Sequence, residues 1–233
     1  MRVLVTRPLG DAQATARRLA ALGLEAIVAP LLEVHLHDGP EVRLDGVQAI
    51  LVTSANGARA IARRTSRRDI PVFAVGRQTA EAARQAKFSD VRNADGDGKA
   101  LARAVSHWAR PGDGSLLHAS GAEAEGRLAA ELEAGGFRVL KETLYDVAAA
   151  PALPPVAAEG LKAGRVDAAL FFSARSARVF CDSVIAAGMK DAALSVVAVA
   201  ISAATAEALK PLRFREVRVA SAPNQDALLA LLG

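Results

Sequence analysis

Hydroxyl residues and glycines follow most of the short apolar runs of this sequence, and Arg7 stands beside one of them. They stand in six places, which are Thr6-Arg7, Thr53-Ser54, Gly76 to Thr79, Ser120-Gly121, Phe172-Ser173 and Ser202 to Thr205. If the apolar runs are parallel strands, the loops after them expose backbone N–H groups and helix N-termini, which bind carboxylates by donating hydrogen bonds to them. The same residue types are preferred helix N-caps worth about 1 kcal/mol each, so any single one is first a capping residue. Six together indicate a surface that accepts an anion.

Tyr145 is the only tyrosine and stands at the end of an apolar strand that leads into a proline-rich stretch. A buried phenol is often a core side chain that needs one hydrogen-bond partner. Its chemical use is as a proton donor to a leaving hydroxyl. From the residues alone both interpretations stand.

The usual catalytic devices are missing from the sequence. It has no glycine-rich dinucleotide or phosphate loop and no Gly-x-Ser-x-Gly elbow. His35 and His37 have a spacing that suits a metal, but they lie in a linker-like stretch, where a role as surface loop residues is the better interpretation. Cys181 is the single cysteine, which rules out an intrachain disulfide and a cysteine zinc cluster. We expect no cofactor and no metal.

Composition limits the partners. The 233 residues carry a net charge of +4, and aromatic residues make up only 4% of the chain. The basic excess suits an anionic ligand, but scarce aromatics and the lack of a helix-turn-helix argue against nucleic acid. No apolar run reaches the roughly 18 residues of a membrane span, and the chain starts with a strand-like segment instead of a signal peptide. The expected location is the cytoplasm.

Alternation of short apolar runs with alanine-rich stretches of helical period predicts an α/β fold, with parallel sheets flanked by helices. Glycines that end three of the alanine-rich stretches, Gly23, Gly136 and Gly188, support this prediction. The predicted strands are Val3 to Val5, Ala26 to Val28, Ala49 to Val52, Val72 to Val75, Leu116 to His118, Arg138 to Leu140, Ala168 to Phe172, Val196 to Ile201 and Glu216 to Val219.

An internal repeat predicts that the chain holds two similar domains. A shift of 126 positions aligns Ala74–Ala94 with Ala200–Ala220, and nine of the 21 pairs are identical. A second block, Ser54 to Arg59, matches Ser173 to Arg178 at four positions. A weaker third match joins the two helix ends at Gly23 and Gly136. The blocks keep their order in both halves.

Two stretches have the composition of domain crossings, residues 30–40 and 146–155, because prolines and a glycine interrupt the first and three prolines interrupt the second. Two linkers predict a discontinuous first domain of residues 1–34 and 156–233. The second domain is then residues 38–147. We expect the anion-binding loops to face the cleft between these domains.

Seven short motifs together resemble the uroporphyrinogen-III synthase family over essentially the whole chain. They are Val3 to Pro8, Ala29 to Glu33, Leu51 to Gly57, Ala74 to Ala80, Leu144-Tyr145, Phe172 to Ala177 and Ala200 to Ala206. The resemblance implies two α/β domains joined by a two-stranded linker, and a monomer. It also implies a lyase without metal or cofactor, which cyclises the linear tetrapyrrole hydroxymethylbilane to uroporphyrinogen III in haem biosynthesis. Water is lost and ring D is inverted.

The resemblance also implies roles for residues. Tyr145 matches the family tyrosine thought to assist departure of the ring A hydroxyl. The side chains expected to bind the carboxylate-rich substrate are Arg7, Ser54, Thr79, Ser120, Gly121, Ser173, Ser202 and Thr205. The second copy differs from the first, with Phe172 in place of Thr53 and Ser202 in place of Gly76. The alternative function is a two-domain regulatory module that binds a small anion.

Overall fold

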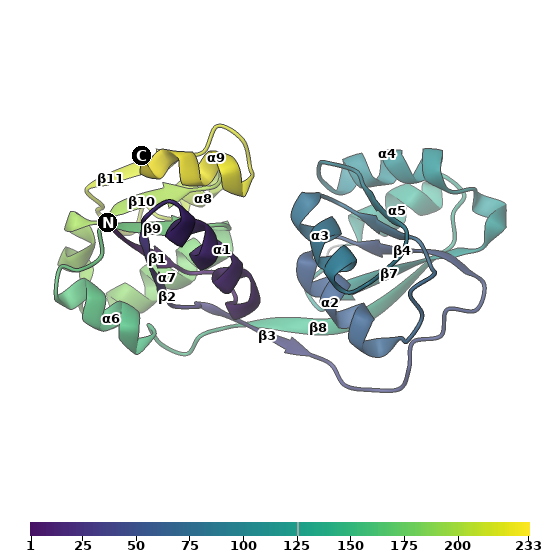
Figure 1. Ribbon diagram of the computed structural model, residues 1–233, viewed down its shortest axis with the longest axis horizontal. Coiled ribbons are helices and arrows are strands. Elements are labelled where there is room, and N and C mark those ends of the chain that lie inside the picture. The colour runs from purple at the N-terminus through teal and green to yellow at the C-terminus, as the bar shows by residue number, and fades with distance from the viewer. Residues whose placement is uncertain (125) are drawn as a thin grey trace. The chain divides into compact units, whose positions relative to one another are not determined.

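The computed structural model describes residues 1–124 and 126–233, which form two compact units (Figure 1). The split unit consists of residues 1–33 and 148–233, so two separate segments of the chain build it. The middle unit is continuous and consists of residues 34–147.

The split unit contains a five-stranded sheet with the order β11-β10-β9-β1-β2 among the described residues. Its strands are β1 (Arg2–Val5), β2 (Glu25–Val28), β9 (Ala168–Phe171), β10 (Val197–Ala200) and β11 (Glu216–Val219). All the pairs between them are parallel. The central strands are apolar along their whole length because helices cover both faces of the sheet.

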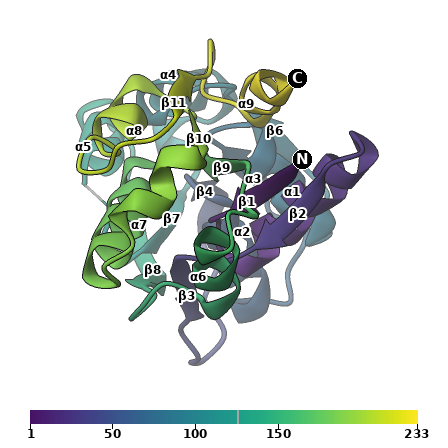
Figure 2. The ribbon, with the colours of Figure 1, turned by 90° about the vertical axis from the view of Figure 1, so that its left-hand side faces the viewer.

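The helices of this unit form two layers, one on each face of the sheet (Figure 2), and alternate residues of the central strands belong to the hydrophobic cluster under one layer or the other. One layer holds α1 (Leu9–Ala21) and α9 (Gln225–Leu229). The other holds α6 (Pro155–Lys162), α7 (Ala174–Ala186) and the short α8 (Ala203–Glu207).

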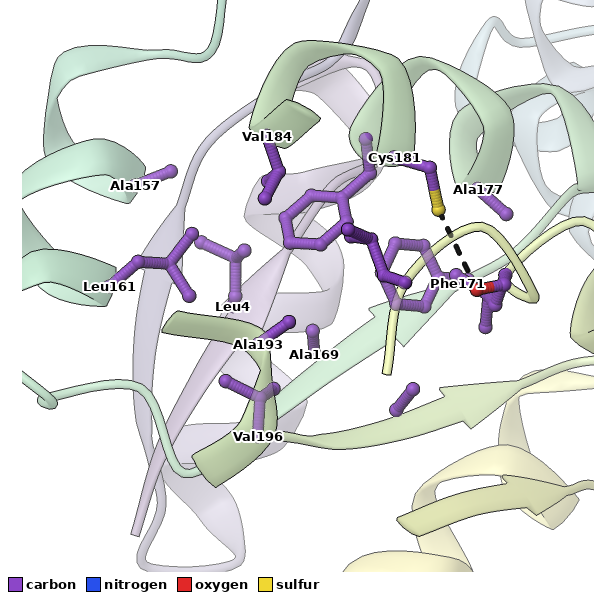
Figure 3. Packing of buried hydrophobic residues seen from close by; sticks show 14 of the residues in the cluster. Leu4, Ala157, Leu161, Ala169, Phe171, Ala177, Cys181, Val184, Ala193 and Val196 are labelled. Carbon is purple, nitrogen blue, oxygen red and sulfur yellow. Dashed lines mark hydrogen bonds between the residues drawn. The ribbon is translucent and has the colours of Figure 1, made fainter. Parts of the chain in front are cut away.

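The layer of α6 and α7 packs around aromatic and aliphatic side chains, with Cys181 among them (Figure 3). Phe171 and Phe180 meet edge to face at 5.2 Å between ring centroids. Burial raises the pKa of the Cys181 thiol to about 12, so the thiol stays protonated and is a core group.

The middle unit contains a six-stranded sheet with the order β3-β8-β7-β4-β5-β6 in the described chain. Its strands are β3 (Leu32–Leu36), β4 (Val47–Val52), β5 (Val72–Ala74), β6 (Val91–Asn93), β7 (Ser115–Gly121) and β8 (Val139–Ala149). The pairs from β8 to β6 are parallel. Helices α2 (Ala55–Arg64) and α3 (Arg77–Gln85) cover one face, and α4 (Gly98–Trp108) and α5 (Arg127–Ala134) cover the other.

The two copies of the sequence repeat occupy equivalent positions in the two sheets. The repeated segment is β5-α3-β6 in the middle unit and β10-α8-β11 in the split unit, and each occupies the same edge of its sheet. The two units differ in which of the equivalent strands comes first along the chain. The five strands of the middle unit that have counterparts run along the chain from β4 to β8, and β3 is an additional edge strand. The split unit instead begins with β1 and β2, the counterparts of β7 and β8. One unit is therefore a circular permutation of the other.

The prediction of parallel sheets flanked by helices is confirmed, and each predicted strand coincides with an observed one. Two observed strands, β3 and β6, were not predicted. Strand β3 is at the edge of its sheet, where a sequence with prolines and glycine nearby is tolerated. Strand β6 has three residues, all only half-buried, so its apolar pattern is weak. Of the helices described, none is long and apolar enough to cross a membrane.

Candidate functional site

In each sheet the direction of winding reverses between two central strands, and ligands of doubly wound sheets bind beyond the carboxyl ends of such strands. In the middle unit the reversal falls between β4 and β7. Strand β4 leads into Thr53 and Ser54, and β7 ends at Gly121. The predicted residues of this unit therefore gather at one edge.

Ser54 and Tyr145 meet at this edge. Ser54 is the N-cap of α2, and its hydroxyl accepts a hydrogen bond from the backbone N–H of Gly57 at 3.0 Å. The Tyr145 hydroxyl lies 2.7 Å from Ser54 Oγ, so a helix N-terminus, a serine and the phenol form one chain of hydrogen bonds. Tyr145 is 8% exposed and reaches the edge from β8.

A bulge in the pairing of β7 with β8 directs Tyr145 to this place. Ser120 pairs with Thr143, but Gly121 pairs with Tyr145, which leaves Leu144 as an extra residue on β8. Leu144 and Tyr145 are both buried, against the alternation of a regular strand. The extra residue turns the ring onto Gly121, where a Cβ atom would lie 2.8 Å from two ring carbons of Tyr145. Only glycine leaves room for this ring position.

His118 lies just before this edge on β7 and is 3% exposed. Its Nε2 atom is 3.5 Å from the Thr53 hydroxyl. Burial, with a smaller contribution from the charge of Lys141, holds the pKa of His118 below its usual range. The imidazole is thus neutral at pH 7 and belongs to the core.

Neutral burial of His118 predicts a loss of stability in acid. The unfolded histidine takes up a proton below about pH 6.5, whereas the folded one resists protonation, so the free energy of unfolding is fully retained above that pH and falls below it. Urea unfolding at pH 7.5 and pH 5.5 measures the loss. We expect a smaller loss for His118→Gln than for the wild type, and equal losses would contradict this account of His118.

The split unit has the corresponding caps. Ser173 caps α7 by accepting from the backbone N–H of Ser176 at 3.1 Å, as Ser54 does for α2. Ser202 caps α8, and its hydroxyl lies 3.1 Å from that of Thr205. The structure thus pairs two of the predicted residues, Ser202 and Thr205, within one turn.

Arg7 has a different environment from the one its prediction implied. It is 7% exposed, its guanidinium lies 3.0 Å from Asp11, and it stacks over the Phe172 ring at 4.1 Å. It also donates to Gln225 at 3.2 Å. The acid four residues after Arg7 was a signal for this pair, because it lies one helical turn further on. The charge of Arg7 is therefore compensated inside the split unit.

The remaining predicted residues of the middle unit are Ser120 and Thr79. Ser120 is 1% exposed, and its hydroxyl donates to the backbone oxygen of Glu142 at 3.2 Å, so it joins β7 to β8. Thr79 lies in the first turn of α3 and is 6% exposed. In the described part of the chain, no three acidic, histidine or cysteine side chains are grouped to hold a metal.

Fold and site together define an α/β protein of two permuted, doubly wound units with polar side chains beyond the carboxyl ends of the strands. The family model described as HEM4, uroporphyrinogen-III synthase HemD, matches residues 13–230. The chain belongs to the uroporphyrinogen-III synthase family. Its reaction is accordingly that of a lyase of haem biosynthesis, the cyclisation of hydroxymethylbilane to uroporphyrinogen III.

Solved structures agree with this fold. The uroporphyrinogen-III synthetase of Helicobacter pylori is 16% identical, with a TM-score of 0.65 and coverage of 100% of this chain and 98% of that chain. A mutant uroporphyrinogen III synthase of the extreme thermophile Thermus thermophilus is 20% identical, with a TM-score of 0.50 and coverage of 100% and 97%. No curated protein matches the sequence.

Proposed function

We propose that Tyr145 is the acid of this reaction and gives its phenolic proton to the departing hydroxyl of hydroxymethylbilane. The observation that carries the proposal is the position of the phenol, 2.7 Å from Ser54 Oγ beyond the carboxyl ends of β4 and β7. The C–O bond breaks, the hydroxyl leaves as water, and a phenolate remains. When the macrocycle closes, the attacked pyrrole carbon loses a proton, which returns to the phenolate.

Substrate carboxylates are held, in this proposal, by hydroxyls and backbone N–H groups at the strand ends of each unit. In the middle unit these are Thr79 and the backbone at Gly121. In the split unit they are Ser173, Ser202 and Thr205. The buried Arg7 and Ser120 contribute by fixing the loops that carry these groups. Several weak contacts to many carboxylates would fold the bilane for closure, which is a positioning effect.

Incubation with freshly prepared hydroxymethylbilane tests the function. The products are oxidised and the type I and type III porphyrin isomers are separated. We expect predominantly type III isomer, because spontaneous closure without ring inversion gives type I. Type I product alone, at a rate independent of protein concentration, would refute the proposed function.

We also propose that the chain works as a monomer in the cytoplasm. The cytoplasmic location is supported by the single, buried cysteine, which fits a reducing compartment. Sedimentation equilibrium at micromolar concentration checks the monomer, and a dimer mass would count against it.

A further inference from the structure

We infer that Ser54 is a positioning residue that acts through Tyr145, by linking the phenol to the N-terminus of α2. This inference rests on the proposed role of Tyr145 as the acid. It differs from the carboxylate-binding role expected for Ser54, because here the partner of the serine is the phenol and its effect falls on the chemical step.

The hydrogen-bond capacity of Ser54 suits it to support the phenol. The hydroxyl has one proton and two acceptor sites. One acceptor site takes the backbone N–H of Gly57 at 3.0 Å, and the Tyr145 oxygen lies 2.7 Å away. When the phenol points its proton at the leaving hydroxyl, Ser54 can donate its own proton to the phenol oxygen. After proton transfer the same bond becomes a charge-assisted hydrogen bond to the phenolate, which is stronger than its neutral form.

The N-terminus of α2 stabilises the negative charge of the phenolate. Helix N-termini carry a partial positive charge, and the first turn of α2 contains no acidic residue that would cancel it. The turn is also held closely to the sheet, since a Cβ atom at Gly57 would lie 2.7 Å from the backbone oxygen of Ala119. Ser54 therefore holds the phenol at a fixed point in a favourable field.

The split unit shows that capping does not require such a partner. Ser173 caps α7 with the same geometry, but its hydroxyl lies 3.0 Å from the Ser176 hydroxyl. The residue before it is Phe172, where the middle unit has Thr53. A serine cap is thus common to both units, and the phenol is an addition found in the middle unit.

A double-mutant cycle of Ser54→Ala and Tyr145→Phe tests the inference, with kcat and KM measured for type III product. We expect Ser54→Ala to lower kcat about tenfold with KM within about twofold, and to change little further in the Tyr145→Phe background. Ser54→Thr, which keeps the hydroxyl, should recover most of kcat. Asp97→Ala is the control, because Asp97 caps α4 of the same unit through the Ala100 N–H and touches neither residue.

The outcomes separate two failures. If Ser54→Ala mainly raises KM, and its effect multiplies with that of Tyr145→Phe, Ser54 holds substrate and the inference is overturned. If the wild type forms no type III isomer, the proposed function itself fails. If Asp97→Ala loses as much kcat as Ser54→Ala, loss of a cap explains the effect, and the inference is overturned as well.

Discussion

Replacing Tyr145 with phenylalanine should lower the turnover for type III product by about 100-fold, the lower range of what a positioned general acid contributes. The variant removes the proton that the leaving hydroxyl takes, while the ring remains packed against Gly121. Ser54 keeps its bond to the Gly57 N–H, so α2 remains capped. Steady-state kinetics with separated porphyrin isomers measures the effect.

Thermal unfolding of Tyr145→Phe is the control for this prediction. The melting temperature should stay within a few degrees of that of the wild type, because a single partly buried hydrogen bond contributes about 1 kcal/mol. Wild-type turnover in the folded variant would remove Tyr145 from the mechanism.

Replacing Gly121 with alanine should lower kcat by about 30-fold, which corresponds to displacing the phenol by an ångström or less. The new methyl group would lie 2.8 Å from the Tyr145 ring, so the ring must move and the hydroxyl must leave Ser54. Gly121 does not have a positive φ, so alanine fits the backbone and the effect is confined to the ring. The measurement is kcat for type III product, with circular dichroism to confirm folding.

Gly98→Ala is the matched control, because a Cβ atom at Gly98 meets no atom within 4 Å and the residue belongs to α4 of the same unit. Its kcat should equal that of the wild type. The account of Gly121 is wrong if both glycine variants behave alike.

Much of the fold could be predicted from the sequence because parallel strands covered on both faces are apolar runs, and the strand ends carry recognisable caps. The repeat also predicted equivalent blocks, and Ser54 and Ser173 are indeed equivalent N-caps. Tyr145 was predicted at the end of a strand, whereas β8 continues beyond it to Ala149, and its contact with Ser54 was not predicted. The contact depends on the bulge at Leu144, and a bulge needs a register that no short-range pattern records.

The environment of Arg7 is a second feature that local sequence does not predict. A basic residue after a strand has the same local pattern whether it faces a ligand or a core carboxylate. The choice was made by Asp11 and Phe172, and the second of these is 165 residues away in the chain. Side chains brought together by sheet assembly decide such cases.

Because the split unit is built from both ends of the chain, the two units can fold in a fixed order during translation. Residues 34–147 are contiguous, so the middle unit can complete its sheet while the rest of the chain is still being made. The first strand, β1, can pair with β2 early, but its other edge has to wait until β9 emerges more than 160 residues later. During that interval the edge of β1 that will face β9 lacks its strand partner, and unpaired strand edges favour aggregation, so we expect chaperones to bind this part of the nascent protein.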